Sequence, residues 1–254
     1  MSLNRLRISF MMTLRMLLRR RIVLLLMLVI PAIFLGIVSL TTSERPLPFR
    51  LSSLDEEPVV AIPEEGIHFV FFAVASVGFL LSFLALNLIQ KNRHVTRRLI
   101  LCGYSPTELL TSKLAALLVF IVVVSTYVGL LTNFLYEIDH LGWFIFSLVS
   151  ICFVYGCYGL LVGSLIRGEL EGILLIVLLV NIDVGWLQNP LFYEGAQNQE
   201  VIRYLPAYFP SQAALIAAFT DYSISQAIRA AYLYGAMFLL FSLLIYYKTM
   251  KSYR

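Results

Sequence analysis

Residues 67–89 read IHFVFFAVASVGFLLSFLALNLI and contain no Asp, Glu, Lys or Arg. A helix of about 20 apolar residues is long enough to cross the hydrocarbon core of a bilayer. This stretch therefore predicts a membrane-spanning helix. It is followed directly by the basic segment 90–113, which reads QKNRHVTRRLILCGYSPTELLTSK and connects this apolar run to the next one.

The whole composition agrees with a membrane protein. Of the 254 residues, 60% are apolar and 13% are charged, whereas soluble domains carry about 25% charged residues. This excludes a soluble globular domain and a disordered chain, which both need more charge. The net charge is +4, but most basic residues flank apolar runs, so we do not expect a nucleic-acid-binding protein.

Five further apolar runs predict membrane helices, and together with 67–89 they make one transmembrane domain, 1–254. They are residues 22–40, 114–135, 143–166, 172–186 and 223–247. Run 22–40 is longer than the roughly 7–15 apolar residues of a signal peptide and lacks a small-x-small cleavage site after it, so we expect it to be retained. Run 172–186 is short and holds Asn181 and Asp183 near its far end.

The orientation follows from the basic residues, which are commoner on the cytoplasmic side of membrane proteins. Six spans place fifteen Lys and Arg on one side and four on the other. The four are Arg45, Arg50, Arg203 and Arg229. We therefore predict a multi-pass protein of the plasma membrane, the inner membrane in bacteria, with both termini in the cytoplasm.

Residues 1–21 are expected to form an amphipathic helix in the cytoplasmic interface. Apolar residues recur at helical spacing, and arginines project from the opposite side. The apolar set is Leu3, Leu6, Phe10, Leu14 and Leu17, and the basic set is Arg5, Arg15 and Arg19. A simple positively charged anchor is the alternative interpretation.

The segment 90–113 predicts a short cytoplasmic helix with a marked end. Gly103 is suited to end that helix, because glycine readily adopts the left-handed conformation. Ser105, Pro106 and Glu108 then form the sequence pattern of a capping box that begins the next helix. A helix bounded in this way between two spans would move both spans when a partner binds it. The alternative is a basic loop that only sets the topology.

The two long segments on the outer side differ in character. Residues 41–66 carry four prolines and several acidic residues, and we expect an irregular, solvated loop there. Residues 187–222 are largely apolar, and Pro206 and Pro210 divide them into pieces too short to cross a membrane. We expect two short helices that form a re-entrant hairpin, covered by neighbouring spans.

Two smaller patterns carry less information. Gly159 and Gly163 form a small-x-x-x-small motif that permits close packing of membrane helices but names no partner. Cys102, Cys152 and Cys157 show no metal-binding or disulfide spacing, and we interpret them as packing residues.

Taken together, these parts resemble the permease subunits of type-2 ABC exporters. The resemblance covers the whole chain: an all-α membrane fold with an interfacial helix, six spans, a cytoplasmic coupling helix and an outer re-entrant hairpin. Its best local match is to the family's R-x-L…G…(S)…E…K pattern around the coupling helix. The resemblance implies that the ATPase-contact residues are Arg93, Arg97, Arg98, Gly103, Tyr104, Ser105, Pro106, Glu108 and Lys113. It implies that the re-entrant hairpin is marked by Pro206, Phe209 and Pro210.

The resemblance also implies partners. Two permease copies, expected as a homodimer, and two ATP-binding cassette subunits form such an exporter, and cargo leaves between the permeases. This chain has no G-x-x-x-x-G-K-[ST] phosphate loop. ATP and Mg²⁺ are therefore expected on a separate ATPase, with no cofactor in this chain and no enzymatic activity of its own.

Two other classes remain open from the sequence. An intramembrane serine protease would need an activated Ser and His, and no Gly-x-Ser-Gly is present; a metalloprotease would need H-E-x-x-H, which is also missing. A structural or sensory membrane subunit is the second alternative. The Phe- and Tyr-rich spans suit an amphiphilic or lipophilic cargo for efflux, although lipid-facing aromatic residues produce the same composition.

Overall fold

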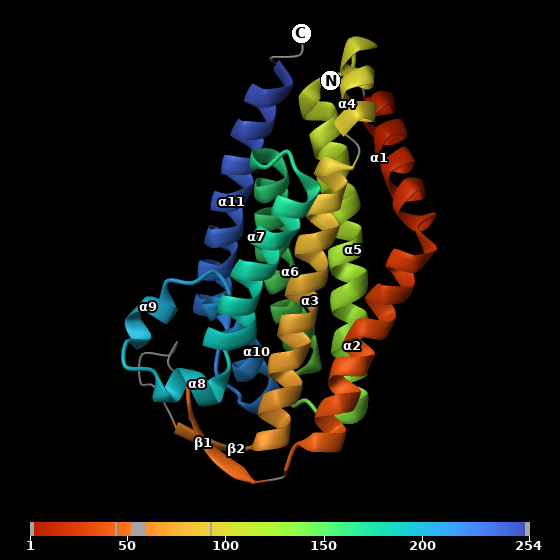
Figure 1. Cartoon of the computed structure of the whole chain (residues 1–254). Coiled ribbons are helices and arrows are strands. Elements are labelled where there is room, and N and C mark those ends of the chain that lie inside the picture. Colours follow the sequence, from red (N-terminus) through yellow and green to blue (C-terminus); the bar gives the residue numbers. More distant parts are fainter. Residues whose placement is uncertain (1–2, 44, 52–58, 92, 252–254) are drawn as a thin grey trace.

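The structure, a computed structural model, describes residues 3–43, 45–51, 59–91 and 93–251. Long helices run side by side, and both ends of the described chain lie at the same end of the bundle (Figure 1). The long helices are α2 (Arg21–Thr41), α3 (Glu64–Gln90), α5 (Pro106–Leu135), α6 (Leu141–Leu165), α7 (Glu169–Ile182) and α11 (Ser225–Lys251). The shorter elements are α1 (Leu3–Leu18), β1 (Pro46–Arg50), β2 (Val59–Pro63), α4 (Arg93–Leu101), the π-helical turn η1 (Asp183–Leu187), α8 (Pro190–Gly195), α9 (Gln199–Arg203) and α10 (Tyr208–Phe219).

Six helical segments among the described residues are long and apolar enough to cross a membrane. They correspond in order to the six predicted runs, with α7 and η1 together forming the fifth. The prediction of an all-helical architecture with six such helices is therefore confirmed, and it fits a multi-pass membrane protein. The only sheet in the described residues has two strands.

The fifth segment is longer than predicted. It covers Glu169–Leu187, whereas the sequence indicated 172–186. The charged residues Glu169 and Glu171 ended the apolar run in the sequence, but they lie in the first turn of α7. Negative side chains are stabilised there by the helix dipole, so the helix begins before its apolar part.

The core lies between α3 and α6, which make the most extensive helix–helix contact; α6 also packs against α5, α10 and α11. Gly159 of α6 faces the backbone of α3 so closely that a Cβ there would lie 2.2 Å from the carbonyl oxygen of Ser82. At Gly163 a Cβ would lie 2.9 Å from Cβ of Ile89, also on α3. The small-residue motif therefore packs within the chain, against α3.

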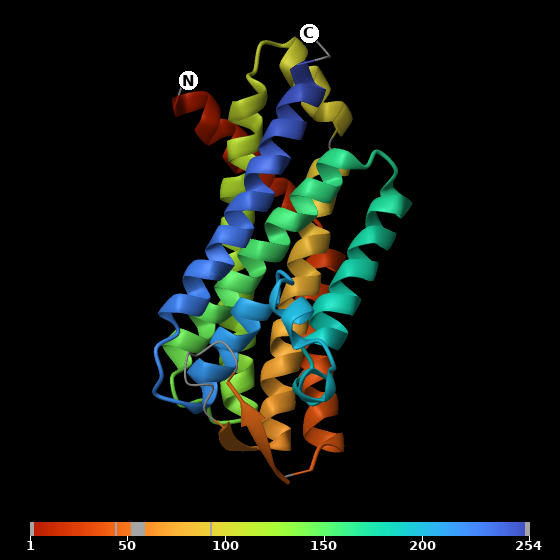
Figure 2. The ribbon, with the colours of Figure 1, turned by 90° about the vertical axis from the view of Figure 1, so that its left-hand side faces the viewer.

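The prediction of an irregular loop for 41–66 is wrong for two stretches. β1 and β2 form an antiparallel pair in which Pro46 faces Pro63 and Pro48 faces Ala61. The N–H of Glu64 donates to the carbonyl of Arg45 at 2.8 Å. Because hydrogen-bonded and non-hydrogen-bonded pairs alternate, the prolines occupy non-hydrogen-bonded positions, and they break no ladder bond. The hairpin lies at the end opposite the described termini (Figure 2).

The segment 187–222 contains three helices, α8, α9 and α10, where two were expected. Pro206 separates α9 from α10, as predicted. Pro210 does not break the chain: it lies in the first turn of α10, where a backbone N–H has no partner within the helix. Ten of the twelve residues of α10 are buried, so this helix is an internal part of the bundle.

Helix α1 is amphipathic and packs along α5. Leu17 is buried, and Phe10 and Leu14 are partly buried against the core. Arg5, Arg15 and Arg19 are exposed. The predicted apolar face therefore turns towards the other helices of the chain.

Candidate functional site

The candidate site begins with α4, a short helix of nine residues between α3 and α5. Its end is a left-handed turn at Gly103, whose φ is 89°. The N–H of Gly103 donates to the carbonyl of Ile100, and the N–H of Tyr104 donates to that of Leu99, both at 3.0 Å. This is the double hydrogen bond of a Schellman motif, which favours glycine at its left-handed position. The predicted break of the helix at Gly103 is confirmed.

Helix α5 begins directly after this turn, at Pro106. The backbone N–H of Ser105 donates to Oε2 of Glu108 at 3.3 Å, which is the reciprocal half of the predicted capping box. Glu108 is 5% exposed, and its neighbour Ser112 donates to its carbonyl oxygen. Both ends of the connection between α4 and α5 are thus defined by local hydrogen bonds.

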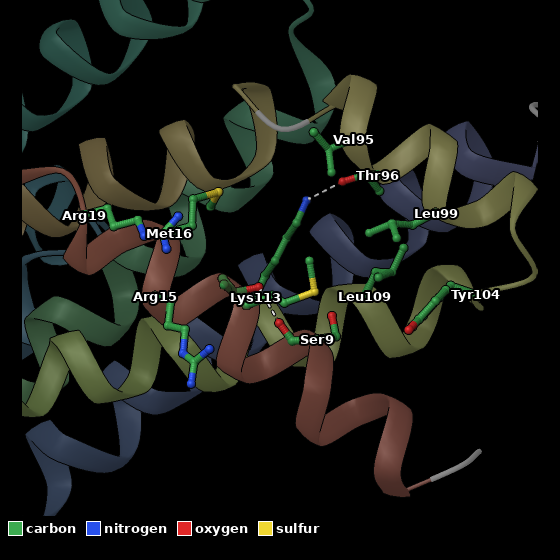
Figure 3. Close-up of a pocket in the computed structure, with 12 residues that line it drawn as sticks. Ser9, Arg15, Met16, Arg19, Val95, Thr96, Leu99, Tyr104, Leu109 and Lys113 are labelled. Carbon is green, nitrogen blue, oxygen red and sulfur yellow. Dashed lines mark hydrogen bonds between the residues drawn. The ribbon is translucent and has the colours of Figure 1, made fainter.

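A cavity of about 470 Å³ lies between α1, α4 and α5 (Figure 3). Its lining combines cations, hydroxyls and apolar side chains. The lining residues are Ser9, Met12, Thr13, Arg15, Met16, Arg19, Val95, Thr96, Leu99, Tyr104, Leu109 and Lys113.

Lys113 is the buried cation of this cavity. Its side chain is 6% exposed, and its Nζ donates to Oγ1 of Thr96 on α4 at 3.1 Å. The same Nζ lies 5.6 Å from the ring centroid of Tyr246 on α11. Lys113 therefore connects α5 with the preceding helix α4 and with α11, which is far away in the sequence.

Two arginines add connections around α4. Nη2 of Arg93 donates to the carbonyl of Gly163, near the end of α6, at 3.5 Å. Nη1 of Arg5 on α1 donates to the carbonyl of Gly103 at 3.4 Å, and its guanidinium lies 5.8 Å from the ring centroid of Tyr104. Side-chain hydrogen bonds thus join α4 to α6, and the turn that follows it to α1.

The predicted coupling residues fall into two groups. Arg93, Glu108 and Lys113 make contacts inside the site, whereas Arg97 and Arg98 are exposed. Leu101 and Cys102 extend the exposed surface at the end of α4, and Leu101 is 68% exposed. The exposed side of α4 therefore combines positive charge with an apolar residue.

The predicted hairpin residues lie away from this site, in the half of the bundle towards the strands (Figure 1). Pro206 and Pro210 are buried, and Phe209 is partly buried. Phe209 packs edge-on against Tyr208, with ring centroids 5.1 Å apart. The structure does not bring these residues together with α4.

Asp183 was not selected from the sequence as a site residue, yet it is fully buried in η1. Its carboxylate accepts hydrogen bonds from the hydroxyl of Tyr155, from Nε2 of Gln188 and from the backbone N–H of Ala207. The bonds from Gln188 and Ala207 are both 3.0 Å long. The signal in the sequence was the acidic residue itself, because a carboxylate inside an apolar run needs buried partners.

A second cavity of about 530 Å³ lies between α2, α3 and the η1 end of α7. Phenylalanines from two helices supply much of its surface. They are Phe34, Phe71, Phe72, Phe79 and Phe83. Ser76 and Asn181 are the polar members of the lining.

Comparison with known proteins adds no family to this description. No protein-family model matches the chain, and no curated protein matches it.

Proposed function

We propose that this chain is the permease subunit of an ATP-driven type-2 ABC exporter. The observation that carries the proposal is α4: a short helix with a defined C-terminal end, joined by side-chain hydrogen bonds to α5 and α6, that exposes Arg97 and Arg98. These are the properties that a coupling helix needs. It must be rigid enough to transmit a displacement and must offer a surface to a partner.

The proposed transmission follows the contacts of α4. Its N-terminal end continues from α3, and its C-terminal turn leads into α5. The bonds from Lys113 to Thr96 and from Arg93 to Gly163 join it to α5 and α6. A displacement of α4 by a partner would therefore move three of the six long helical segments together.

The partner in this proposal is an ATP-binding cassette ATPase. The chain lacks a phosphate loop, so nucleotide and Mg²⁺ would be bound by that subunit. The exposed guanidinium groups of Arg97 and Arg98 would pair with acidic side chains of the ATPase, while Leu101 would enter an apolar site. No nucleic acid is involved.

The proposed placement is in the plasma membrane, or the bacterial inner membrane, with both termini and α4 in the cytoplasm. Fifteen of the nineteen Lys and Arg residues would then lie on the cytoplasmic side. Helix α1 would lie along the interface, and the segment containing α8, α9 and α10 would form the outer re-entrant part.

The proposed cargo is amphiphilic or lipophilic and is moved out of the cytoplasm. The phenylalanine-lined cavity between α2 and α3 supports this, because aromatic faces bind apolar chains and Asn181 offers a polar group. Helices α2 and α7 also carry many exposed apolar residues, including Ile33 and Leu178. A second copy of the permease would cover part of this surface.

The test is reconstitution of the chain in liposomes with and without an ATP-binding cassette ATPase that co-purifies with it. We expect no ATP hydrolysis by the chain alone. The complex should hydrolyse ATP and export cargo, and transport should continue when the proton gradient is collapsed. Reversal of charge at Arg97 and Arg98 to Glu should uncouple the ATPase from the permease.

Arg45→Glu with Arg229→Glu is the matched control, because it reverses two exposed basic residues near the opposite end of the bundle. It should leave ATP hydrolysis and export unchanged. Robust ATP turnover by the pure chain, or cargo movement driven by a pH gradient without nucleotide, would refute the exporter proposal. A stable complex that hydrolyses ATP without moving any cargo would favour a structural or sensory subunit instead.

A further inference from the structure

We propose that the cavity between α1, α4 and α5 binds the phosphate headgroup of an anionic phospholipid. This goes beyond the proposed transport function and does not depend on an ATPase. The site is built from groups that are far apart in sequence and that converge on one cavity of about 470 Å³.

The cavity is positively charged. Arg15 and Arg19 of α1 and Lys113 of α5 line it, and no Asp or Glu is among its described lining residues. Cations of one sign around a cavity give it a positive potential that attracts an anion. A phosphate oxygen is the acceptor that Arg and Lys bind most readily, through charge-assisted hydrogen bonds.

Lys113 is a buried donor at this cavity. An ammonium group carries three donors, and the structure shows one side-chain acceptor for it, Oγ1 of Thr96. No Asp or Glu is among the described residues that line the cavity around it. Figure 3 shows Lys113 extended between Thr96 of α4 and Ser9 and Met16 of α1. A buried cation with unused donors is stabilised strongly by an anion in the same cavity.

The site lies at the level where two helices leave the predicted hydrocarbon region. Lys113 directly precedes the charge-free run 114–135, and Arg19 lies three residues before the charge-free run 22–40. Two cations from separate segments therefore mark the boundary where each helix leaves the hydrocarbon region. Phospholipid headgroups lie at this boundary.

The apolar part of the lining distinguishes a lipid from a free phosphate ion. Half of the twelve lining residues are apolar or aromatic, with Met12, Met16, Val95 and Leu99 among them. These side chains contribute nothing to the binding of a free phosphate ion, but they can pack against the upper part of an acyl chain. The combination of cations and apolar residues favours a phospholipid.

The experiment uses the purified full-length chain in detergent, titrated with phosphatidylglycerol and, separately, with phosphatidylcholine. Native mass spectrometry counts the bound lipids and measures their affinity. We expect saturable binding of phosphatidylglycerol and clearly weaker binding of phosphatidylcholine. Millimolar inorganic phosphate should not displace the bound lipid. Binding that free phosphate abolishes would assign the site to the ion and overturn the lipid proposal.

The test variant is Arg15→Gln with Arg19→Gln, and the matched control is Arg7→Gln with Arg167→Gln. Each loses two positive charges, but Arg7 and Arg167 do not line the cavity. Both cavity arginines are exposed, so the fold should tolerate the change. The cavity variant should bind phosphatidylglycerol roughly 25-fold more weakly, which corresponds to about fivefold for each charge removed. The control should bind it within a factor of two of the unaltered chain.

Lys113→Met provides a second variant of similar length that removes the buried charge. It should also weaken phosphatidylglycerol binding while leaving phosphatidylcholine binding unchanged. Equal affinity for the two lipids in the unaltered chain would overturn the proposal without reliance on any variant. The same conclusion would follow if the control and the cavity variant lost affinity equally, because binding would then report net charge alone.

Discussion

Asp183 illustrates how a single residue can organise three parts of the bundle. Its carboxylate joins Tyr155 of α6, Gln188 after η1 and the backbone of Ala207 before α10. All three partners are donors, and the two carboxyl oxygens of Asp183 accept from them. Asp183 is the first residue of the π-helical turn at residues 183–187, where the backbone hydrogen bonding departs from that of a regular α-helix.

We expect Asp183→Leu to destabilise the protein by roughly 3 kcal/mol or more, because each buried donor left without an acceptor costs about 1–3 kcal/mol. Asp183→Asn keeps one acceptor oxygen and should lose less. Thermal unfolding of the purified chain in detergent measures both. Asn181→Leu is the control, since Asn181 is exposed and bonds only within its own helix. Equal melting temperatures for Asp183→Leu and the control would contradict the structural role.

Gly159 shows the opposite kind of requirement, for space rather than for hydrogen bonds. The substitution Gly159→Ala would place a Cβ 2.2 Å from the carbonyl oxygen of Ser82, so α3 and α6 would have to separate. We expect a loss of roughly 1–3 kcal/mol in the free energy of unfolding, as is usual for overpacking. Gly142→Ala on the same helix meets no atom within 4 Å and should be neutral. Thermal unfolding compares the two, and similar values would argue against close packing of α3 on α6.

At the scale of elements, the connection from α4 to α5 combines a local signal that ends one helix with a local signal that begins the next. The Schellman motif at Gly103 ends one helix, and the Ser105–Glu108 pair begins the next. Only two residues, Tyr104 and Ser105, separate the left-handed turn from Pro106. The angle between α4 and α5 is therefore set by few rotatable bonds.

We expect Glu108→Ala to remove half of the capping box, at a cost of about 1 kcal/mol. Glu108→Gln retains a carbonyl oxygen that can accept from the N–H of Ser105 and serves as the control. Under the proposed function, Glu108→Ala should reduce transport per inserted molecule more than it reduces insertion into the membrane. Transport in vesicles, normalised to the amount of chain, tests this. Intact transport in several variants of residues 93–113 would remove the basis for a coupling helix.

The whole molecule has two different ends. One carries α4 and the described termini, and the other carries the hairpin of β1 and β2 (Figures 1 and 2). The three cysteines differ in their accessibility to a thiol reagent, because Cys102 is exposed whereas Cys152 and Cys157 are buried. Cys102 is therefore a natural reporter for the orientation of α4.

We expect an impermeant thiol reagent to leave Cys102 unlabelled in intact cells and to label it in inverted membrane vesicles. The reason is the predicted cytoplasmic position of α4, among Arg97, Arg98 and Lys113. Cys102→Ser should abolish labelling, which would show that the buried cysteines do not react. Asn198→Cys in the Cys102→Ser background supplies an outer reporter, since Asn198 is exposed near α9. Labelling of Cys102 from outside intact cells would reverse the proposed topology.

The features that the sequence alone determined depend on residues close together in the chain. Six apolar runs predicted six long helices, and Gly103, Ser105 and Glu108 predicted a helix end and a helix start. Capping involves neighbours within about one turn, and run length involves one contiguous stretch, so the order of residues along the chain is sufficient to predict both. The hairpin of β1 and β2 was not predicted from the sequence. Its prolines fit a strand pair only in the register that places them at non-hydrogen-bonded positions, and the register is a property of the pair.

The tertiary structure decided which side chains meet across helices. It brought Asp183 to Tyr155 and Ala207, residues 28 and 24 positions away, and it brought Lys113 to Thr96 and into one cavity with Arg15. These contacts depend on how each helix is rotated and how closely the helices pack. That is set by the shapes of all the facing side chains at once, among them the missing side chain of Gly159 against α3. No local pattern contains this information, so the partners of the buried charges became visible only in the folded bundle.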